Sequence, residues 1–461
     1  MLTSNLNTKD IQVFDLAPFF PQLDAGRLFM VYAPLAGSCF LADADTVQQL
    51  DRGVKDSGAC EERIRAVVSQ ICDISEYSSM LASPDPTVVL NPSNYTKLSI
   101  LPNLKCNFSC RYCYSAKGRS TTVLDAGKMM AMLDYFIDSK RVKSDRLTIF
   151  ISGGGEPLLS WDLVLSLIRY SRQRVADQGF QLELLLMTNG SLLTPEIACH
   201  LRDNDVNVGV SFEILPDIQN SQRGSYDTVS KAIRMLSDYQ VQPSLSSVIT
   251  PSNVERMMEM AETVVRDFPA VRHLNFDPAM SCDLFPTTQS LRDFYKLFVD
   301  NFFAAKRYCG EHHITLDCNA VRRVAKLFPR YCQGKLCLVP SGEISVCHTV
   351  SSPKEYRYAD YIYGEVVDGR VVFDKDKFSM FVAPENYLLD QCRSCIARWH
   401  CGGGCLMYRR NYDNDRFEAV CEFTRTMTAK TLLANLDAAF RQRYNYGVES
   451  IVSQYFLQAT Q

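Results

Sequence analysis

The sequence predicts an α/β protein whose main domain is a parallel sheet covered by helices. Apolar runs of strand length alternate with stretches whose apolar residues recur at helical spacing, which is typical of repeated strand-helix units. Turns rich in cysteine, glycine or asparagine follow several of these runs, as expected where parallel strands end at one edge of a sheet. The six expected strands cover residues 97–101, 147–152, 182–187, 206–211, 244–249 and 273–276.

Residues 1–92 are expected to form a separate α+β domain. Two short strands, at 27–32 and 38–42, precede two helices, at 46–53 and 59–72. This order resembles the small winged-helix peptide-recognition domain of many peptide-modifying enzymes. A generic cap packed on the main domain fits the pattern equally well.

A linker is expected between this domain and the first strand of the main sheet. Turn-forming residues gather at 83–86 and 91–94. The first strand then leads into a loop with three cysteines, Cys106, Cys110 and Cys113, in the spacing C-x3-C-x2-C.

These three thiols predict a site for an iron-sulfur cluster or another soft metal. Thiolates select iron-sulfur clusters, zinc or copper(I) over hard cations. Three cysteines rather than four leave one metal position open, as in sites that bind a substrate or cofactor. A zinc knuckle, or three cysteines that are simply buried, are the alternatives.

The second strand ends in a glycine-rich segment that suits close approach of a ligand. Gly154 and Gly155 have no β-carbon, so backbone and ligand can come close together. Glu156, which precedes Pro157, could accept hydrogen bonds from an ammonium group. An ordinary tight turn is the alternative.

A second group of cysteines lies near the C-terminus. Cys332 and Cys347 bracket Gly342 in the pattern C-x9-G-x4-C. The pattern C-x2-C-x5-C-x3-C follows, and then one more cysteine; its members are Cys392, Cys395, Cys401, Cys405 and Cys421. A pair of zinc ribbons is the alternative, because C-x2-C pairs are typical zinc ligands.

Composition excludes several classes of function. Basic residues number 49 and acidic residues 52, and the two kinds are interspersed, so we expect no nucleic-acid partner. Residues 1–15 lack a signal peptide and no apolar run reaches about 20 residues, so we expect a cytoplasmic protein without a membrane partner. Eighteen cysteines in such a chain indicate metal ligation rather than disulfides.

The cysteine loop, with Tyr112 before its third cysteine and Tyr114 after it, resembles the signature of the radical S-adenosylmethionine (SAM) superfamily. The C-terminal array resembles the SPASM domain of radical SAM peptide and protein maturases. Together the two resemblances cover residues 97–425. They imply a partial (β/α)6 barrel at 93–310 and a cysteine-rich SPASM domain at 311–428, which leaves a helical tail at 429–461.

The resemblance also implies one 4Fe-4S cluster, two auxiliary iron-sulfur clusters and bound SAM. Cys106, Cys110 and Cys113 would hold the cluster that binds SAM. The first auxiliary cluster would be held by Cys332, Cys347 and Cys405, and the second by Cys392, Cys395, Cys401 and Cys421. The fourth ligand of the first auxiliary cluster stays open between Cys318, Cys337 and an iron that binds the substrate.

Several strand-end residues correspond to SAM contacts in this family. The segment Gly154, Gly155, Glu156 and Pro157 would contact the amino group of SAM. Asn189, Ser211 and Glu213 would surround its ribose and methionine. Arg223 is a candidate for binding its carboxylate, and a solvated arginine before a helix cap is the alternative. Many relatives have aspartate at the position of Glu213.

The implied reaction begins when a flavodoxin- or ferredoxin-type reductant supplies one electron, and SAM is cleaved to a 5'-deoxyadenosyl radical. We expect the radical to remove hydrogen from a ribosomally made precursor peptide and so form a thioether, carbon-carbon or carbon-oxygen cross-link. Asp277 and His348 are candidate proton acceptors. His348 stands where sulfatase maturases have aspartate, which counts against that activity. A maturase of a folded protein or of a peptide-derived cofactor, and a catalytically silent peptide-binding partner, remain alternatives.

Overall fold

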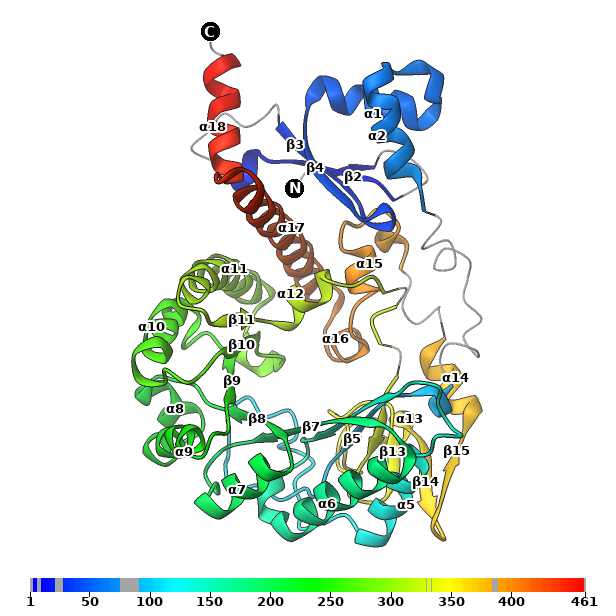
Figure 1. The fold of residues 1–461 in the computed structure, drawn as a ribbon, viewed down its shortest axis with the longest axis vertical. Coiled ribbons are helices and arrows are strands. Elements are labelled where there is room, and N and C mark those ends of the chain that lie inside the picture. Colours follow the sequence, from blue (N-terminus) through cyan, green and yellow to red (C-terminus); the bar gives the residue numbers. More distant parts are fainter. Residues whose placement is uncertain are drawn as a thin grey trace.

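The computed structural model describes residues 3–5, 10–20, 28–74, 91–328, 330–332, 334–383 and 389–459. In these residues the chain forms a four-stranded sheet near the N-terminus and an eleven-stranded sheet that organises the rest. Figure 1 shows the large sheet with helices on its outer side and the small sheet at the opposite end of an elongated molecule.

All six expected strands are present in the large sheet and lie side by side in chain order. They are β5 (Lys97–Ile100), β6 (Arg146–Ile151), β7 (Gln181–Thr188), β8 (Val206–Ser211), β9 (Pro243–Ile249) and β10 (His273–Pro278). Each strand pairs in parallel with the next. The connecting helices include α5 (Ala126–Phe136), α6 (Trp161–Gln178), α7 (Pro195–Asp203), α8 (Pro216–Gln222), α9 (Tyr226–Asp238) and α10 (Met257–Asp267). The α/β fold class is therefore confirmed.

The main core lies between the outer face of this sheet and its helices. On β6, Leu147, Ile149 and Ile151 are buried, and they belong to the same apolar cluster as Leu133 and Phe136 of α5. Burial of one such side chain contributes about 1.5–3 kcal/mol. The core fixes the strands, and the carboxyl ends of the strands then carry the polar residues of the candidate site.

The sheet has more strands than the six expected. β11 (Thr315–Asp317) adds a parallel strand beside β10. At the other edge, β12 (Leu336–Leu338) pairs in parallel with β5. An antiparallel extension follows β12, formed by β13 (Glu343–Ser345), β14 (Ile362–Val367) and β15 (Arg370–Phe373). The segment after residue 310 therefore continues the central sheet at both edges.

The N-terminal part contains the expected strands and helices. β3 (Leu28–Ala33) and β4 (Ser38–Asp43) form a hairpin, and α1 (Ala44–Lys55) and α2 (Glu62–Cys72) follow. Two further strands, β1 (Thr3–Asn5) and β2 (Gln12–Asp15), complete the antiparallel sheet. Of the expected linker, 83–86 lies outside the described residues, and Pro92–Asn94 forms a short 3-10 helix.

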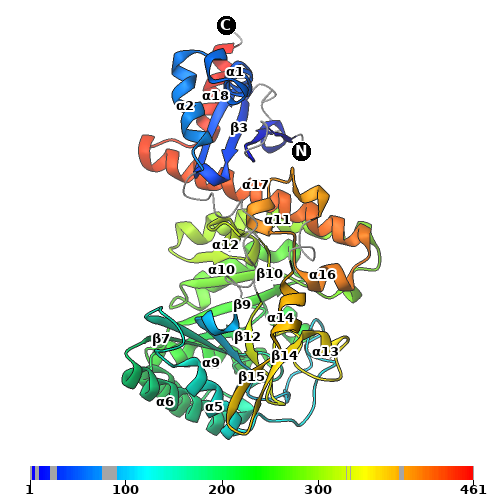
Figure 2. The ribbon, with the colours of Figure 1, turned by 90° about the vertical axis from the view of Figure 1, so that its right-hand side faces the viewer.

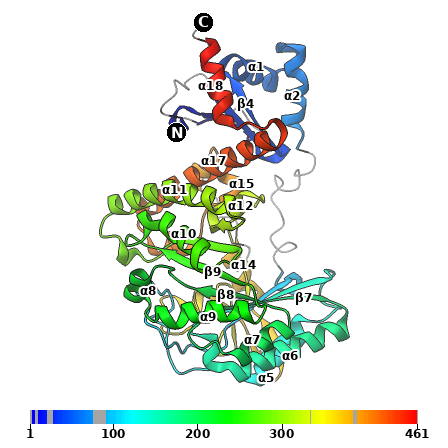
Figure 3. The same cartoon turned by 60° about the vertical axis from the view of Figure 1, so that its left-hand side comes forward.

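Two C-terminal helices connect the ends of the molecule. α17 (Asn414–Tyr444) packs along α11 (Thr288–Glu311), where the rings of Tyr295 and Phe423 stack at 4.4 Å. Figures 2 and 3 show α17 passing from α11 to the N-terminal sheet, where α18 (Val448–Ala459) follows. The helix crosses residue 429, so the helical tail continues from the cysteine-rich segment. No helix among the described ranges has the length and apolarity to cross a bilayer.

Candidate functional site

The cysteine loop, residues 101–124, follows β5 and is fixed against the glycine-rich end of β6. The Asn103 side-chain amide donates to the Glu156 carbonyl at 3.0 Å and to Ser160 Oγ at 2.9 Å. The Asn103 carbonyl accepts from the backbone N–H of Gly155 at 3.0 Å. A β-carbon on Gly155 would lie 1.7 Å from the Lys105 carbonyl oxygen. The glycine is therefore required by the cysteine loop that crosses it.

Glu156 joins the ends of β6 and β7. Its carboxylate accepts from Thr188 Oγ1 at 2.6 Å, from Asn189 N at 2.7 Å and from Leu158 N at 3.1 Å. Burial raises the pKa of this carboxyl, and the three hydrogen bonds oppose that rise. The described partners of the Glu156 carboxylate are thus residues at the end of β7 and in its own turn. Gly154 and Gly155 pack their backbone against the cysteine loop.

Asn189, at the end of β7, also contacts the cysteine loop. Its side-chain amide donates to Asn107 Oδ1 at 2.8 Å, and Asn107 in turn donates to Ser191 Oγ at 2.8 Å. Asn107 stands between the first two cysteines of the loop. Sequence analysis did not single out Asn107, because nothing local shows that its partner is 82 residues away.

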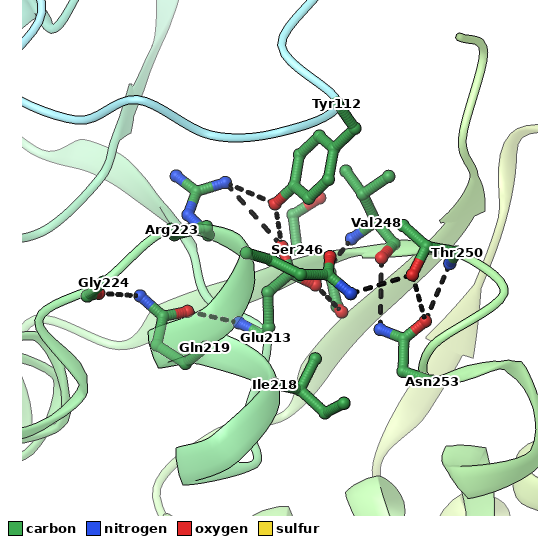
Figure 4. A network of polar contacts seen from close by, with 12 residues as sticks. Tyr112, Glu213, Ile218, Gln219, Arg223, Gly224, Ser246, Val248, Thr250 and Asn253 are labelled. Carbon is green, nitrogen blue, oxygen red and sulfur yellow. Dashed lines mark hydrogen bonds and ion pairs between the residues drawn. The ribbon is translucent and has the colours of Figure 1, made fainter. Parts of the chain in front are cut away.

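A buried polar network attaches the loop to the ends of β8 and β9 (Figure 4). The Tyr112 hydroxyl donates to the Glu213 carboxylate, which also accepts from Ser247 Oγ at 2.5 Å and Val248 N at 3.1 Å. Arg223 Nη1 donates to the Tyr112 hydroxyl at 2.8 Å and lies 3.7 Å from Glu213 Oε1. The network crosses from the loop to two neighbouring strands, so it fixes the position of the segment between Cys110 and Cys113.

Glu213 is enclosed completely. Its side chain is 0% exposed and that of Arg223 is 8% exposed. Burial raises the pKa of the Glu213 carboxyl, whereas the Arg223 guanidinium and the hydrogen bonds oppose the rise. For Arg223 burial works toward a lower pKa, but Tyr112, Cys110 and Glu213 outweigh it and the pKa is raised.

The backbone is strained directly after Glu213. Ile214 has φ +68°, a left-handed conformation that a β-branched residue rarely adopts. The Gln219 side chain accepts from Glu213 N at 2.8 Å and so helps to hold the turn. Ser211, the last residue of β8, is half-buried and pairs with Ser246 of β9. Strain of this kind gathers at sites whose geometry the surrounding structure over-determines.

The three loop thiols fit a cluster through their chemistry and their surroundings. Cys106, Cys110 and Cys113 are half-buried on one loop. Burial raises the pKa of the Cys110 thiol, and the cations Arg223 and Arg119 act in the opposite direction. In the described ranges no three cysteine, histidine or carboxylate side chains converge on a point suited to one metal ion. A cubane cluster is bound differently, because each thiolate ligates a separate iron.

Four of the C-terminal cysteines surround one cavity. Cys392, Cys395, Cys401 and Cys421 line it together with Phe417, Gly403 and Arg425 among others. The first three come from the turns around α15 (Arg398–Cys401), and Cys421 comes from α17. The donor set is entirely sulfur, which fits an iron-sulfur cluster or zinc.

Cys332, Cys347 and Cys405 form a second group. Burial raises the pKa of Cys405 to about 12, and Cys347 and Cys332 add to the rise. Cys337 is fully buried on β12 beside Leu101 and Val339, and Cys347 is among the groups that influence it. Cys318 is also fully buried, but Asp277 and Arg322 are its charged neighbours. Cys337 pairs with Ser345, two residues before Cys347, which places its strand next to this group.

Asp277 is occupied by hydrogen bonds at the end of β10. Its carboxylate accepts from Asn319 N and from Asn275 Nδ2, both at 2.7 Å, and Arg322 lies 3.8 Å away. These contacts tie β10 to α12 (Asn319–Val324).

His348 lies beside the cysteine loop. Lys335 Nζ donates to His348 Nδ1 at 2.7 Å, and the Tyr114 ring meets the imidazole edge-on at 6.3 Å. Burial, assisted by the Lys335 charge, lowers the pKa of His348 to about 3. His348 is therefore neutral near pH 7 and accepts a hydrogen bond at Nδ1.

Part of the chain is similar in sequence to known proteins. The family description Radical SAM superfamily matches residues 100–264. A serine-type anaerobic sulfatase-maturating enzyme of Klebsiella aerogenes is 23% identical over 337 residues, covering 68% of this chain and 79% of that enzyme. An uncharacterized protein of Methanocaldococcus jannaschii is 25% identical over 179 residues; the match covers 38% of this chain and only 59% of that protein.

A solved structure shares the fold. Native anSMEcpe with bound AdoMet and Kp18Cys peptide superposes with a TM-score of 0.60 at 16% sequence identity, covering 73% of this chain and 98% of the other. At this identity the likeness concerns the fold alone.

Proposed function

We propose that the chain is a maturase of the radical SAM superfamily that cross-links a ribosomally made peptide; residues 100–264 match the description of that superfamily. The observation that supports this most is the attachment of the cysteine loop to four neighbouring strand ends. Gly155, Asn189, Glu213 and Ser247 stand on those strand ends, and each belongs to a contact network with the loop. The loop is thereby held at the carboxyl ends of the parallel strands, where active sites lie in barrels of this type.

In this proposal Cys106, Cys110 and Cys113 hold a 4Fe-4S cluster and leave one iron for SAM. When bound, the cluster supplies the electron that cleaves SAM to methionine and a 5'-deoxyadenosyl radical. Protein residues provide position and surroundings rather than the electron itself.

Different residues around the loop would bind different parts of SAM. Gly154 and Gly155 let the backbone of the cysteine loop pass directly over the end of β6, and this segment would lie beside the amino group of SAM. Asn189 and Ser211 stand at the ends of β7 and β8 and would face the ribose. Arg223 carries the charge that suits the SAM carboxylate, and its Nε has no hydrogen-bond partner among the described residues although it is buried.

Glu213 would act differently from a direct SAM ligand. Its carboxylate is fully enclosed and accepts from Tyr112, Ser247 and Val248. We infer that Glu213 sets the position of Tyr112 and Arg223, which in turn face the cofactor.

The C-terminal cysteines would hold two auxiliary clusters. Cys392, Cys395, Cys401 and Cys421 around one cavity support the second of these. For the first, we favour Cys337 over Cys318 as the fourth ligand beside Cys332, Cys347 and Cys405, because Cys337 pairs with Ser345 two residues before Cys347; an open iron is the other option. Such clusters would take up the electron left on the product or bind the substrate.

A peptide substrate is favoured by two observations. The matched sulfatase-maturating enzyme modifies a protein according to its name, and the superposed anSMEcpe structure contains a peptide. His348 follows Cys347, whereas sulfatase maturases have aspartate there, so we favour a cross-link over sulfatase maturation. The pKa of His348 is far below 7 and its Nδ1 accepts from Lys335, so His348 is a weak proton acceptor; Asp277 is tied to Asn319 and Asn275.

The proposal includes a cytoplasmic location and a flavodoxin- or ferredoxin-type reductant. Reducing conditions keep thiols available for cluster ligation. Maturation of a folded protein or of a peptide-derived cofactor is the second candidate, and it rests on the same named relative.

The test uses short peptides encoded beside the gene. Each peptide is incubated anaerobically with the reconstituted enzyme, SAM and dithionite, and its mass is measured before and after. Loss of two hydrogens from one peptide, absent when Cys106, Cys110 and Cys113 are replaced by alanine, is the expected result. Modification of a folded protein but of no peptide would favour the second candidate.

A further inference from the structure

Arg119 follows the three cysteines on the cysteine loop, and its side chain folds back onto the segment that carries them. Its Nη1 donates to the Phe108 carbonyl, and its Nη2 lies 3.4 Å from Cys113 Sγ with donor geometry. One guanidinium therefore contacts both the backbone between the first two cysteines and the sulfur of the third. Arginine can do this because its donors form a rigid, planar fork.

The surrounding chain holds Arg119 in place from two sides. Ser120 N donates to the Leu104 carbonyl at 3.3 Å, which returns the segment after Arg119 to the start of the loop. On the other side, Lys354 Nζ donates to the Arg119 carbonyl at 3.2 Å. A β-carbon on Gly118 would lie 2.6 Å from Glu355 Oε1, so residues 352–355 pack directly against the turn.

The charge of Arg119 is not neutralised by an acidic group. In the parts of the chain that the structure describes, its guanidinium contacts the Phe108 carbonyl and the Cys113 sulfur, neither of which is a carboxylate. Arg223, which also acts on the Cys110 thiol, has Glu213 at 3.7 Å. The Nε of Arg119 is buried without a hydrogen-bond partner. Arg119 thus presents an uncompensated positive charge to Cys113.

A donor on a ligating sulfur affects the cluster that the sulfur holds. Hydrogen bonds to cluster sulfurs and the net charge nearby are two determinants of the reduction potential. Reduction adds one electron and no proton, from 2+ to 1+ for the cluster core, so the site becomes more negative. A positive donor on the thiolate stabilises that reduced form more than the oxidised form.

We propose that Arg119 is a positioning residue that raises the reduction potential of the cluster on the cysteine loop by donating to the Cys113 thiolate. The proposal rests on the proposed function in one respect, namely that the loop binds a 4Fe-4S cluster. The electron comes from an external low-potential reductant and Arg119 gives up no proton.

The test is a reductive titration with dithionite, followed by electron paramagnetic resonance. Four anaerobically reconstituted proteins are compared: wild type, Arg119→Gln, Arg119→Lys and Lys117→Gln. Lys117 is an exposed cation on the same loop, so its replacement removes equal charge without touching a sulfur. The loop signal is defined as the part of the wild-type spectrum that disappears when Cys106, Cys110 and Cys113 are all replaced by alanine.

The expected result is a midpoint potential that shifts to more negative values in Arg119→Gln. Arg119→Lys should lie between this variant and wild type, because it keeps the charge but not the fork. Lys117→Gln should match wild type. Equal potentials in Arg119→Gln and wild type, at equal iron content, would overturn the proposal.

If Arg119→Gln loses the loop signal, the midpoint potential of Arg119→Lys tests the proposal instead. A more negative potential in that variant supports the proposal, and a wild-type potential overturns it. Loss of the signal from both variants also overturns it, because Arg119 would then be needed for assembly rather than for the potential. Absence of any cysteine-dependent signal from wild type would instead refute the proposed function together with the role of Arg119.

Discussion

Glu213 is a buried carboxylate that positions the side chains around it without itself contacting the cofactor in our proposal. It accepts hydrogen bonds from Tyr112 on the cysteine loop and from Ser247 on β9, and it balances the charge of Arg223. A buried charge pair contributes little when it is intact, but removing one partner is costly because the other charge stays buried. The importance of Glu213 is therefore best seen by removing its charge.

Replacing Glu213 with glutamine should lower the stability of folding by about 3 kcal/mol, because Arg223 then remains buried without its counter-charge. The thermal unfolding midpoint of the anaerobic protein measures the change. Glu259→Gln is the matched control: Glu259 is 52% exposed and pairs with Arg256, so its loss should change stability by less than about 0.5 kcal/mol. Equal midpoints for the two variants would contradict the role given to Glu213.

The strands and the cysteine loop act as one unit, because the loop is built into the ends of the strands. Gly155 illustrates the dependence. A β-carbon there would overlap the Lys105 carbonyl at 1.7 Å, and that carbonyl also accepts from Glu156 N at 2.6 Å. The clash involves backbone on both sides, so a side-chain rotation cannot relieve it.

Gly155→Ala should therefore displace the loop and reduce the iron bound there, even if the remainder of the protein folds. Iron and sulfide analysis after reconstitution measures the loss. Gly310→Ala is the control, since Gly310 lies in α11 with open space around its missing β-carbon and should tolerate alanine or gain stability. Full iron binding by Gly155→Ala would show that the loop can bind a cluster in another position.

Sequence patterns were sufficient for the long elements, but not for the contacts between them. β6 and β7 have six and eight residues, and most of these residues are apolar, which makes such strands easy to detect. β11 has only three residues, too few for a periodic signal. The pairing of Tyr112 with Glu213 joins residues 101 apart, and the positive φ of Ile214 contradicts the preference of isoleucine. Such features follow from tertiary packing rather than from local sequence.

The N-terminal sheet meets the cysteines around α15 through an apolar cluster, which includes Leu16, Met30 and Ile396, and through a few polar contacts. Asp10 accepts from Arg398 at 2.8 Å and from the Trp399 indole at 3.0 Å. The Tyr32 hydroxyl lies 2.5 Å from His400 Nε2. Arg398, Trp399 and His400 immediately precede Cys401, so movement of the N-terminal sheet would shift that cysteine.

Asp10→Ala should loosen this junction, because hydrogen bonds to a charged group contribute about 1.5–3 kcal/mol. Hydrogen exchange is the suitable measurement: amides of β2 and α15 should exchange faster, while those of β6 to β8 stay unchanged. Asp51→Ala removes only an exposed ion pair with Lys55 on α1 and should leave β2 and α15 protected. Unchanged exchange in Asp10→Ala would mean that apolar packing alone holds the junction.

The assignment of the cysteine loop is tested most directly by release of 5'-deoxyadenosine. Wild type and the Cys106→Ala/Cys110→Ala/Cys113→Ala variant are reconstituted anaerobically and incubated with SAM and dithionite. We expect release from wild type that depends on both additions and that the triple variant abolishes. Equal release from the triple variant, or none from wild type with its full complement of iron, would contradict the proposed radical chemistry.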